Sequence, residues 1–308
     1  SYVDQLEAQQ GSKVSFVRSV INRVKRTNSR KKRMFKIIFP EGDNTKILKA
    51  VNQTLEEGYV VPILIGNPDV ILQKSADLGL DNIKQAKIIN HVEAKNLEKY
   101  TKHLFEMRHR KGVMLREAQR LMLDANYYAS MAVHLGDADG MVTGATMKYR
   151  EAVKPILQVI GPGRSKTAAG LNIVLIKDKM LLFADTTVNI NPTAQQIANT
   201  ALHASKVATY FKLKPKIAML SYTNFTSRGE NPKKMSEAAR IVKEQEPTYI
   251  VDGEMQADTA VSSRIAKDIF SFSEIKEFRI GCRSLFYITV HAQCYGRQVR
   301  GTKWSWNL

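Results

Sequence analysis

The first 277 residues of this 308-residue chain contain neither cysteine nor tryptophan. Both cysteines, Cys282 and Cys294, lie in the last 31 residues, and their spacing matches neither a zinc site nor a disulfide framework. A body without cysteine excludes a thiol nucleophile there. We therefore expect a protein of a reducing compartment, the cytoplasm.

Long apolar runs and several catalytic signatures are also missing. No stretch of 18 apolar residues is present, so we expect no transmembrane helix and no membrane partner. Residues 1–16 lack the basic start and apolar core of a secretory signal. The chain has no GxGxxG, GxxxxGK[ST] or GxSxG motif, which argues against a dinucleotide fingerprint, a phosphate loop and a serine nucleophile elbow. His103 and His109 lack metal-ligand spacing, so we expect no metal.

Positive charge is abundant, and it is concentrated at the two ends. The net charge is +18, with nine basic and two acidic residues in positions 1–33, and five basic and none acidic in positions 278–308. The 244 residues between therefore carry only +6 (18 − 7 − 5). A nucleic-acid protein should gather its charge on one face of the folded body, so we expect no nucleic-acid partner. Residues 1–33 are expected to form a basic helical linker, broken at Thr27, Asn28 and Ser29.

Short apolar runs alternate with helical patterns along the rest of the chain. The expected strands cover residues 36–39, 60–66, 86–90, 140–144, 171–176, 180–184, 216–220 and 248–251. Long helices are expected over 92–110 and 113–135. This alternation predicts the α/β class, with mainly parallel sheets covered by helices on both faces. Gly161-Pro162-Gly163 is the candidate boundary between domains at 34–163 and 164–277.

Polar loops follow four of the expected strands, and ligands of open α/β sheets bind at such carboxyl ends. The candidate binding residues in these loops are Thr143, Gly144, Asp185, Asn189, Ser221, Thr223, Asn224, Ser227, Arg228, Asp252, Glu254 and Asp258. Hydroxyls, an amide and a guanidinium ahead of a helix, as in 221–228, suit a phosphate or nucleotide-like ligand. The three acids of 252–258 suit Mg²⁺ or a general base.

Each loop also has a simpler explanation. The aspartates of 136–140 can bond their own backbone in a turn, and for this loop the turn is the preferred interpretation. Asn191 and Pro192 are explained by helix capping, whereas Asp185 and Asn189 are not. The 221–228 segment fits a solvated loop equally well, and the later acids of 252–258 fit a helix dipole.

Taken together, these segments resemble the phosphate acetyltransferase (phosphotransacetylase) family. The strings that carry the resemblance are KIIFPEGDNTKILKAV (36–51), VPILIGNPDVI (61–71), MRHRKGV (107–113), GDADGMVTGAT (136–146), LLFADTTVNINPTA (181–194), IAMLSYTNF (217–225) and VDGEMQADTA (251–260). FADTTVN and VDGEMQADTA are most similar to the C-terminal phosphotransacetylase-like domain of bacterial NADP-dependent malic enzymes. Residues 1–33 fit the linker to a malic-enzyme half, so we expect a piece of a longer chain.

The resemblance implies two domains of the isocitrate/isopropylmalate-dehydrogenase-like class, with a ligand cleft between them, in a homodimer or larger homo-oligomer. It implies acetyl transfer between phosphate and coenzyme A (CoA), with CoA or acetyl-CoA as substrate or effector and no covalently bound cofactor. The family's phosphate-site arginines fall on Arg108 and Lys154. The lysine departs from the family pattern and lacks the guanidinium fork that binds two phosphate oxygens.

The segment at 278–308 does not match the family's catalytic region. The resemblance calls for an Asn-Ile-Ala-Tyr-Lys helix and then a Ser-Arg-Gly segment followed by an aspartate, and none is present. A shifted reading frame or a truncation would explain this atypical tail, and a divergent tail is the alternative. The catalytic residues therefore stay unassigned.

These observations leave three functional hypotheses. The main one is a phosphotransacetylase-like domain of a malic enzyme that binds CoA or acetyl-CoA as a regulatory module and is impaired in catalysis. The alternative is an active phosphate acetyltransferase in which a tail residue such as Arg297 or Arg300 replaces the lost group. A third is an oligomerisation domain without a ligand.

Overall fold

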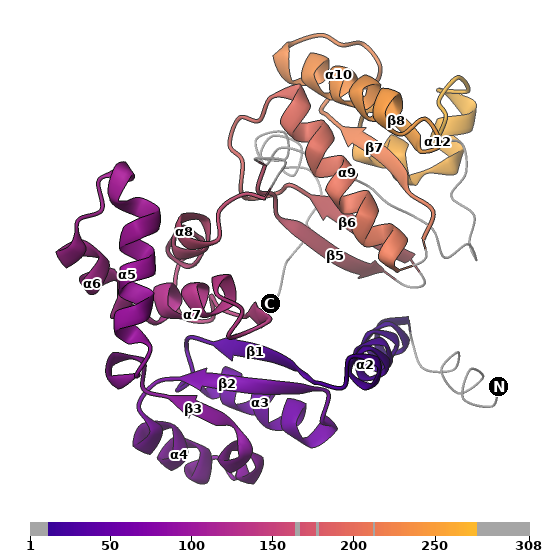
Figure 1. The fold of residues 1–308 in the computed structure, drawn as a ribbon. Coiled ribbons are helices and arrows are strands. Elements are labelled where there is room, and N and C mark those ends of the chain that lie inside the picture. The colour runs from indigo at the N-terminus through magenta and orange to yellow at the C-terminus, as the bar shows by residue number, and fades with distance from the viewer. Residues whose placement is uncertain (1–11, 164–166, 177–178, 212, 276–308) are drawn as a thin grey trace. The chain divides into compact units, whose positions relative to one another are not determined.

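The computed structural model describes residues 12–163, 167–176, 179–211 and 213–275 (Figure 1). The chain divides into two compact units. The N-terminal unit comprises residues 17–161, and the C-terminal unit comprises the described residues from 162 onward together with residues 12–16. The predicted domain limits and the predicted cleft stay predictions, and the atypical tail lies outside the described residues. Among the described helices, none combines the length and the apolarity needed to cross a bilayer.

The N-terminal unit is built on a parallel sheet. Its strands are β1 (Phe35–Phe39), β2 (Val60–Ile65), β3 (Lys87–Ile89) and β4 (Gly140–Met141). Their order in the sheet is β3-β2-β1-β4 and every pairing is parallel. Because β1 is central, the loops after β1 and β4 emerge side by side at the carboxyl edge of the sheet.

Helices cover both faces of this sheet, as the continuous apolar strands require. These helices are α3 (Thr45–Glu57), α4 (Pro68–Asp77), α5 (Leu97–Arg108), α6 (Leu115–Met122), α7 (Ala125–His134) and α8 (Tyr149–Val159), with short 3₁₀ turns at Asp81–Gln85, His91–Glu93 and His109–Lys111. Helix α2 (Ser12–Lys31) precedes β1. Ile38 and Ile63 pack on α5, α6 and α7. Phe39 and Leu64, one residue further along each strand, pack on α3 and α4 on the opposite face.

The C-terminal unit combines two pairs of strands. β5 (Leu171–Ile176) and β6 (Lys179–Ala184) form an antiparallel pair, whereas β7 (Lys216–Leu220) and β8 (Ile250–Met255) are parallel. The helices are α9 (Ala194–Tyr210), α10 (Glu230–Gln245), α11 (Ala257–Val261) and α12 (Ser263–Asp268). Ile217 and Met219 pack on α9 and α10, while Ala218 and Leu220 pack with Ala260 of α11. This layering confirms the predicted α/β class with mainly parallel sheets.

Several predicted element limits were wrong, among them the strand predicted over 140–144, which ends at Met141. Helix α2 continues through Thr27, Asn28 and Ser29 to Lys31. The predicted helix over 113–135 is two helices, because Asp124 caps a new helix at Ala125. Strand β8 runs to Met255, so Asp252 and Glu254 lie within the strand and not in a loop after it.

Candidate functional site

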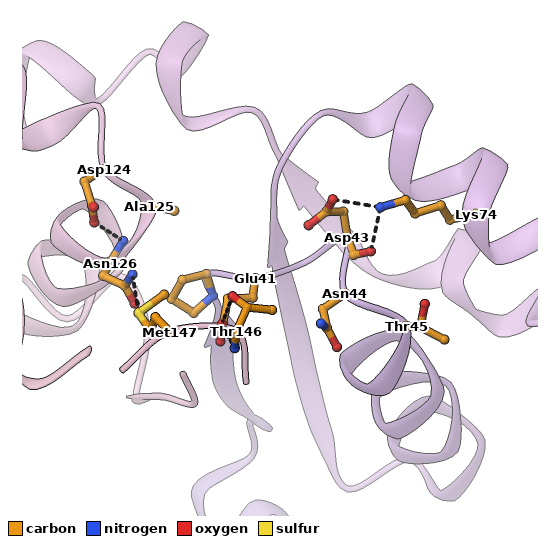
Figure 2. Close-up of a pocket in the computed structure, with 11 residues that line it drawn as sticks. Glu41, Asp43, Asn44, Thr45, Lys74, Asp124, Ala125, Asn126, Thr146 and Met147 are labelled. Atoms are coloured by element: carbon orange, nitrogen blue, oxygen red, sulfur yellow. Dashed lines mark hydrogen bonds and ion pairs between the residues drawn. The ribbon is translucent and has the colours of Figure 1, made fainter. Parts of the chain in front are cut away.

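A pocket of about 420 Å³ lies at the carboxyl edge of the N-terminal sheet. Figure 2 shows its walls, which come from the loop after β1, the N-terminal ends of α3 and α7, and the loop before α8. The lining residues are Pro40, Glu41, Asp43, Asn44, Thr45, Lys74, Asp124, Ala125, Asn126, Thr146 and Met147. Their side chains are mostly polar, and the position matches the edge at which α/β sheets bind ligands.

Glu41 forms one wall of the pocket and is 8% exposed. Its Oε2 accepts hydrogen bonds from the backbone N–H groups of Gly144 at 2.8 Å and Ala145 at 2.9 Å. Its Oε1 accepts from the N–H of Thr146 at 2.6 Å and from the Thr146 hydroxyl. Burial raises the pKa of Glu41, but these hydrogen bonds outweigh it and lower the pKa below its ordinary value. Glu41 is therefore an ionised carboxylate near neutral pH.

Two helix N-termini reach the pocket already capped. Asn44 Oδ1 accepts from the N–H groups of Lys46 and Ile47 in α3, and Asp124 Oδ1 accepts from those of Asn126 and Tyr127 in α7. The capping oxygens thus occupy the donors that a helix N-terminus offers to an anion.

A buried amide connects the pocket to Thr143. The side chain of Asn126 is 5% exposed, and its Oδ1 accepts from the Thr143 hydroxyl at 2.5 Å. Its Nδ2 lies 3.4 Å from the sulfur of Met147. Thr143 and Gly144 were both predicted site residues, and the structure places them in the loop that Glu41 and Asn126 hold from two sides.

The predicted phosphate residues Arg108 and Lys154 both lie in the N-terminal unit, on α5 and α8. Arg108 ends α5, and its Nε is buried without a hydrogen-bond partner among the described residues. Burial and Asp124 raise the pKa of the Tyr127 hydroxyl, and the charge of Arg108 partly offsets them. Glu117 also raises the Tyr127 pKa, and the pKa of Glu117 is itself lowered by Arg120 and, more weakly, by the exposed Lys154. Both predicted cations therefore act electrostatically on neighbouring side chains.

In the C-terminal unit, Asp185 organises the loop after β6. Its carboxylate is 3% exposed and accepts from the backbone N–H groups of Gly170, Thr187, Val188 and Asn189. The side-chain amide of Asn189 donates to the same carboxylate and to the carbonyl of Ala168. The structure therefore brings these two predicted site residues together, and their hydrogen bonds hold the loop itself.

Glu254 of β8 likewise holds the loop after β7 through hydrogen bonds to its backbone. It is 1% exposed, and its Oε1 accepts from the Thr223 hydroxyl at 2.9 Å and from the N–H groups of Thr226 and Ser227 at 2.8 and 2.6 Å. Its Oε2 is buried without a partner among the described residues, as is the hydroxyl of Ser221. This places Ser221, Thr223, Ser227 and Glu254 at one sheet edge.

The other predicted residues of this unit have separate partners. Asn224 pairs with Gln256, donating to its Oε1 at 2.9 Å and accepting from its N–H at 2.7 Å. Asp252 accepts from the Ser273 hydroxyl at 2.6 Å and the Glu274 N–H at 2.9 Å. The Asp258 side chain is exposed and accepts from the N–H of Thr259. Arg228 is exposed.

The two aspartates of the 136–140 loop serve the fold. Asp137 accepts from the buried Tyr100 hydroxyl at 2.6 Å, and Asp139 binds Arg33 and the N–H of Lys36. The preferred interpretation, in which these aspartates bond their own backbone, was wrong, because their partners lie on other elements. Across residues 12–275, leaving out the gaps, no three His, Cys, Asp or Glu side chains gather as a metal site.

The sequence interpretation missed Glu41, Asp124 and Asn126. Glu41 and Asn44 carried the same signal as the four chosen loops, since they follow a buried strand and precede a helix N-terminus. Asn126 gave no such signal because its role depends on a contact with Thr143, which is 17 residues away in the sequence.

The comparison with family models decides the classification. The model of the phosphate acetyl/butaryl transferase family matches residues 15–277. The chain belongs to this family. The match covers both units, so it includes the Glu41 and Arg108 region and the strand-end loops of β6, β7 and β8.

Individual proteins are also similar to this chain in sequence. The chain is 34% identical over 244 residues to a phosphate acetyltransferase of Nitratidesulfovibrio vulgaris, covering 77% of this chain and 34% of that protein. It is 35% identical over 239 residues to a phosphate acetyltransferase of Synechocystis, covering 75% of this chain and 33% of that protein. It is 31% identical over 268 residues to an NADP-dependent malic enzyme of Rhizobium meliloti, covering 86% of this chain and 34% of that protein. The chain thus spans about a third of the length of these relatives.

Solved structures show the same fold. A phosphotransacetylase from Streptococcus pyogenes superposes with a TM-score of 0.78 at 28% identity, covering 92% of this chain and 85% of that one. The resemblance to phosphate acetyltransferases is confirmed. Of the three relatives described above, two are phosphate acetyltransferases and one is a malic enzyme.

Proposed function

We propose that this chain is the acyltransferase part of a phosphate acyltransferase, which moves an acyl group between phosphate and CoA. The family match over residues 15–277 carries this proposal. It favours the alternative hypothesis of the sequence analysis over the regulatory malic-enzyme module. CoA and the acyl phosphate are substrates, and no covalently bound cofactor is required.

The reaction needs cations for the phosphate. The CoA thiolate attacks the carbonyl carbon of the acyl phosphate, a C–S bond forms, and the C–O bond to phosphate breaks with both electrons leaving on the phosphate oxygen. Positive charge near that oxygen stabilises the leaving group. Arg108 suits this role because its guanidinium carries a buried Nε without a partner among the described residues. Lys154 adds a second positive charge from the exposed side of α8.

The thiol proton must pass to a base. Three carboxylates at the described strand ends, Glu41, Asp185 and Glu254, already accept two or more backbone N–H groups each. For Glu41 these hydrogen bonds lower the pKa and reduce the basicity of the carboxylate. We therefore do not assign the base to Glu41, and the base stays unassigned.

The decisive experiment is thioester formation from acetyl phosphate and CoA by the purified chain, followed by absorbance. We expect turnover that falls strongly in an Arg108→Ala variant. A wild-type chain that binds CoA by calorimetry but forms no thioester would favour the regulatory module instead. A chain that neither binds CoA nor forms thioester would overturn both.

The regulatory module is the second candidate, and it rests on the Rhizobium meliloti relative, whose name is that of a malic enzyme. In that case acetyl-CoA binding would act on an attached enzyme half. A homodimer or larger homo-oligomer and a cytoplasmic location accompany either function and stay predictions.

A further inference from the structure

Glu41 makes a set of contacts that its position in the pocket wall alone does not explain. Its two oxygens accept four hydrogen bonds from three consecutive residues, Gly144, Ala145 and Thr146. The donors lie 103 to 105 positions away in the sequence. A single carboxylate of β1's loop thus fixes the backbone of the loop that follows β4.

Glu41 is itself rigidly anchored to the sheet. The N–H of the next residue, Gly42, donates to the carbonyl of Ile65 at the end of β2, at 3.1 Å. A Cβ atom at Gly42 would lie 2.6 Å from that carbonyl oxygen, so only glycine permits this approach. The carboxylate is therefore held by the two central strands, and it transmits their position to the loop.

The loop that Glu41 fixes joins Thr143, a predicted binding residue, to the helix that carries Lys154, a predicted phosphate residue. It begins directly after Thr143, whose hydroxyl donates to Asn126, and it ends where α8 begins at Tyr149. Lys154 lies within α8. A shift of residues 144–146 would therefore move Thr143 at one end and the start of the helix that carries Lys154 at the other.

The backbone N–H groups of Gly144, Ala145 and Thr146 donate to Glu41 and are therefore not free to bind a ligand. Three successive backbone N–H groups that converge on one point form an anion-binding nest. Here the carboxylate of Glu41 occupies that point, so the phosphate must be held by side chains and not by this backbone. The lowered pKa of Glu41 agrees with a permanently ionised occupant at neutral pH.

The geometry points to Glu41 as a positioning residue for acyl transfer: it holds the loop 143–148 so that Thr143 and Lys154 keep their places beside the bound acyl phosphate. This inference rests on the proposed function. Glu41 does not touch the reacting atoms; it acts through the loop.

The test compares Glu41→Gln with Asp139→Asn. Glutamine keeps the size of the side chain but replaces one acceptor oxygen with an NH₂ group, so it cannot accept all four hydrogen bonds. Asp139 is a matched control, because it too is an acid of this sheet that binds backbone and side-chain donors, yet it touches Arg33 and Lys36 and not the 143–148 loop. Both variants are expected to lose some stability.

Three readouts separate positioning from folding. In Glu41→Gln, kcat/KM for acetyl phosphate should fall on the order of 100-fold, since small misplacements at a reacting centre have effects of that size. The KM for CoA should change less than kcat. Amide hydrogen exchange should speed up at Gly144, Ala145 and Thr146 in this variant and stay unchanged in Asp139→Asn.

The outcomes are distinguishable. An inactive wild type refutes the proposed function, while the exchange measurement still reports whether Glu41 holds the loop. An active wild type with an equally active Glu41→Gln variant overturns the positioning role. Equal losses of activity in Glu41→Gln and Asp139→Asn also overturn it, because they would reflect stability alone. Glu41→Asp, which restores the charge on a shorter stem, should recover part of the activity.

Discussion

Arg33 and Asp139 join the start of β1 to the start of β4 through a two-pronged ion pair. Nη1 and Nη2 of Arg33 each donate to a different oxygen of Asp139 at 2.8 Å, and the N–H of Lys36 donates to the same carboxylate at 2.9 Å. The hydrogen bond from Arg33 is the main cause that lowers the pKa of Asp139 to about 2. This contact secures the edge of the sheet opposite the pocket.

The ion pair predicts a specific pH dependence of stability. Because the folded pKa of Asp139 lies below its unfolded value of 3.8, its contribution is complete above about pH 4 and is lost as the pH falls toward about 2. The difference in urea midpoint between the wild type and Asp139→Asn should therefore be constant from pH 8 to pH 5 and shrink below pH 4. The Asp81→Asn variant serves as a comparison, because Asp81 forms an ion pair with Lys84 in which both side chains are exposed. A difference that grows on acidification would contradict the assignment.

Arg108→Ala should affect activity much more than stability. The KM for acetyl phosphate is expected to rise about 10- to 100-fold, the loss of a charge-assisted hydrogen bond. The unfolding free energy should stay within about 0.5 kcal/mol, because the buried Nε of Arg108 has no partner among the described residues. Steady-state kinetics and urea titration measure the two effects. Arg116→Ala removes an exposed arginine of α6 and should change neither.

Lys154→Arg tests the departure from the family pattern. A guanidinium offers two parallel donors to phosphate, whereas the ammonium of lysine is a point charge. We expect the KM for acetyl phosphate to fall about two- to tenfold in this variant and to rise in Lys154→Gln. Unchanged kinetics in both variants would remove Lys154 from the phosphate site.

Asp185→Ala should destabilise the C-terminal unit. The substitution takes away the acceptor of the backbone N–H groups of Gly170, Thr187, Val188 and Asn189, at a cost of about 2 to 5 kcal/mol. Urea unfolding should show an earlier transition. Asp258→Ala is the matched control, since its exposed carboxylate accepts, among the described residues, only from the next N–H, and its effect should stay within about 0.5 kcal/mol. Equal stability of both variants would show that the Asp185 loop contributes little.

The sequence predicted the strands and the layering because these depend on local patterns. Apolar runs such as 36–39 and 216–220 are read directly, and both are strands. The end of α2 could not be read in this way. Thr27 and Ser29 donate their hydroxyls to carbonyls one turn earlier in the helix, and Asn28 donates to the carbonyl of Tyr59. The side-chain donors of all three residues thus find carbonyl acceptors while the helix continues.

The sequence indicated where the polar residues lie in the fold, but it did not indicate what those residues contact. Residues at the carboxyl ends of strands were chosen for ligand binding, and Asp185 and Glu254 do lie at such ends. Their carboxylates nevertheless accept hydrogen bonds from loop N–H groups of the same unit. Composition cannot separate an acid that binds a ligand from one that binds backbone, because the difference lies in where the neighbouring loop folds back. The same reason hid Glu41, whose partners are about a hundred residues away.

Glu41 and Asp185 each hold a loop through hydrogen bonds to its backbone, and this affects which loop positions can vary in sequence within the family. Most of the hydrogen bonds they accept come from main-chain amides, and every amino acid except proline supplies the same amide. Positions such as Ala145 and Val188 can therefore exchange their side chains while the loop keeps its path. Selection can then alter the side chains that these two loops present while the loop backbones stay in place, provided that the two acids themselves are retained.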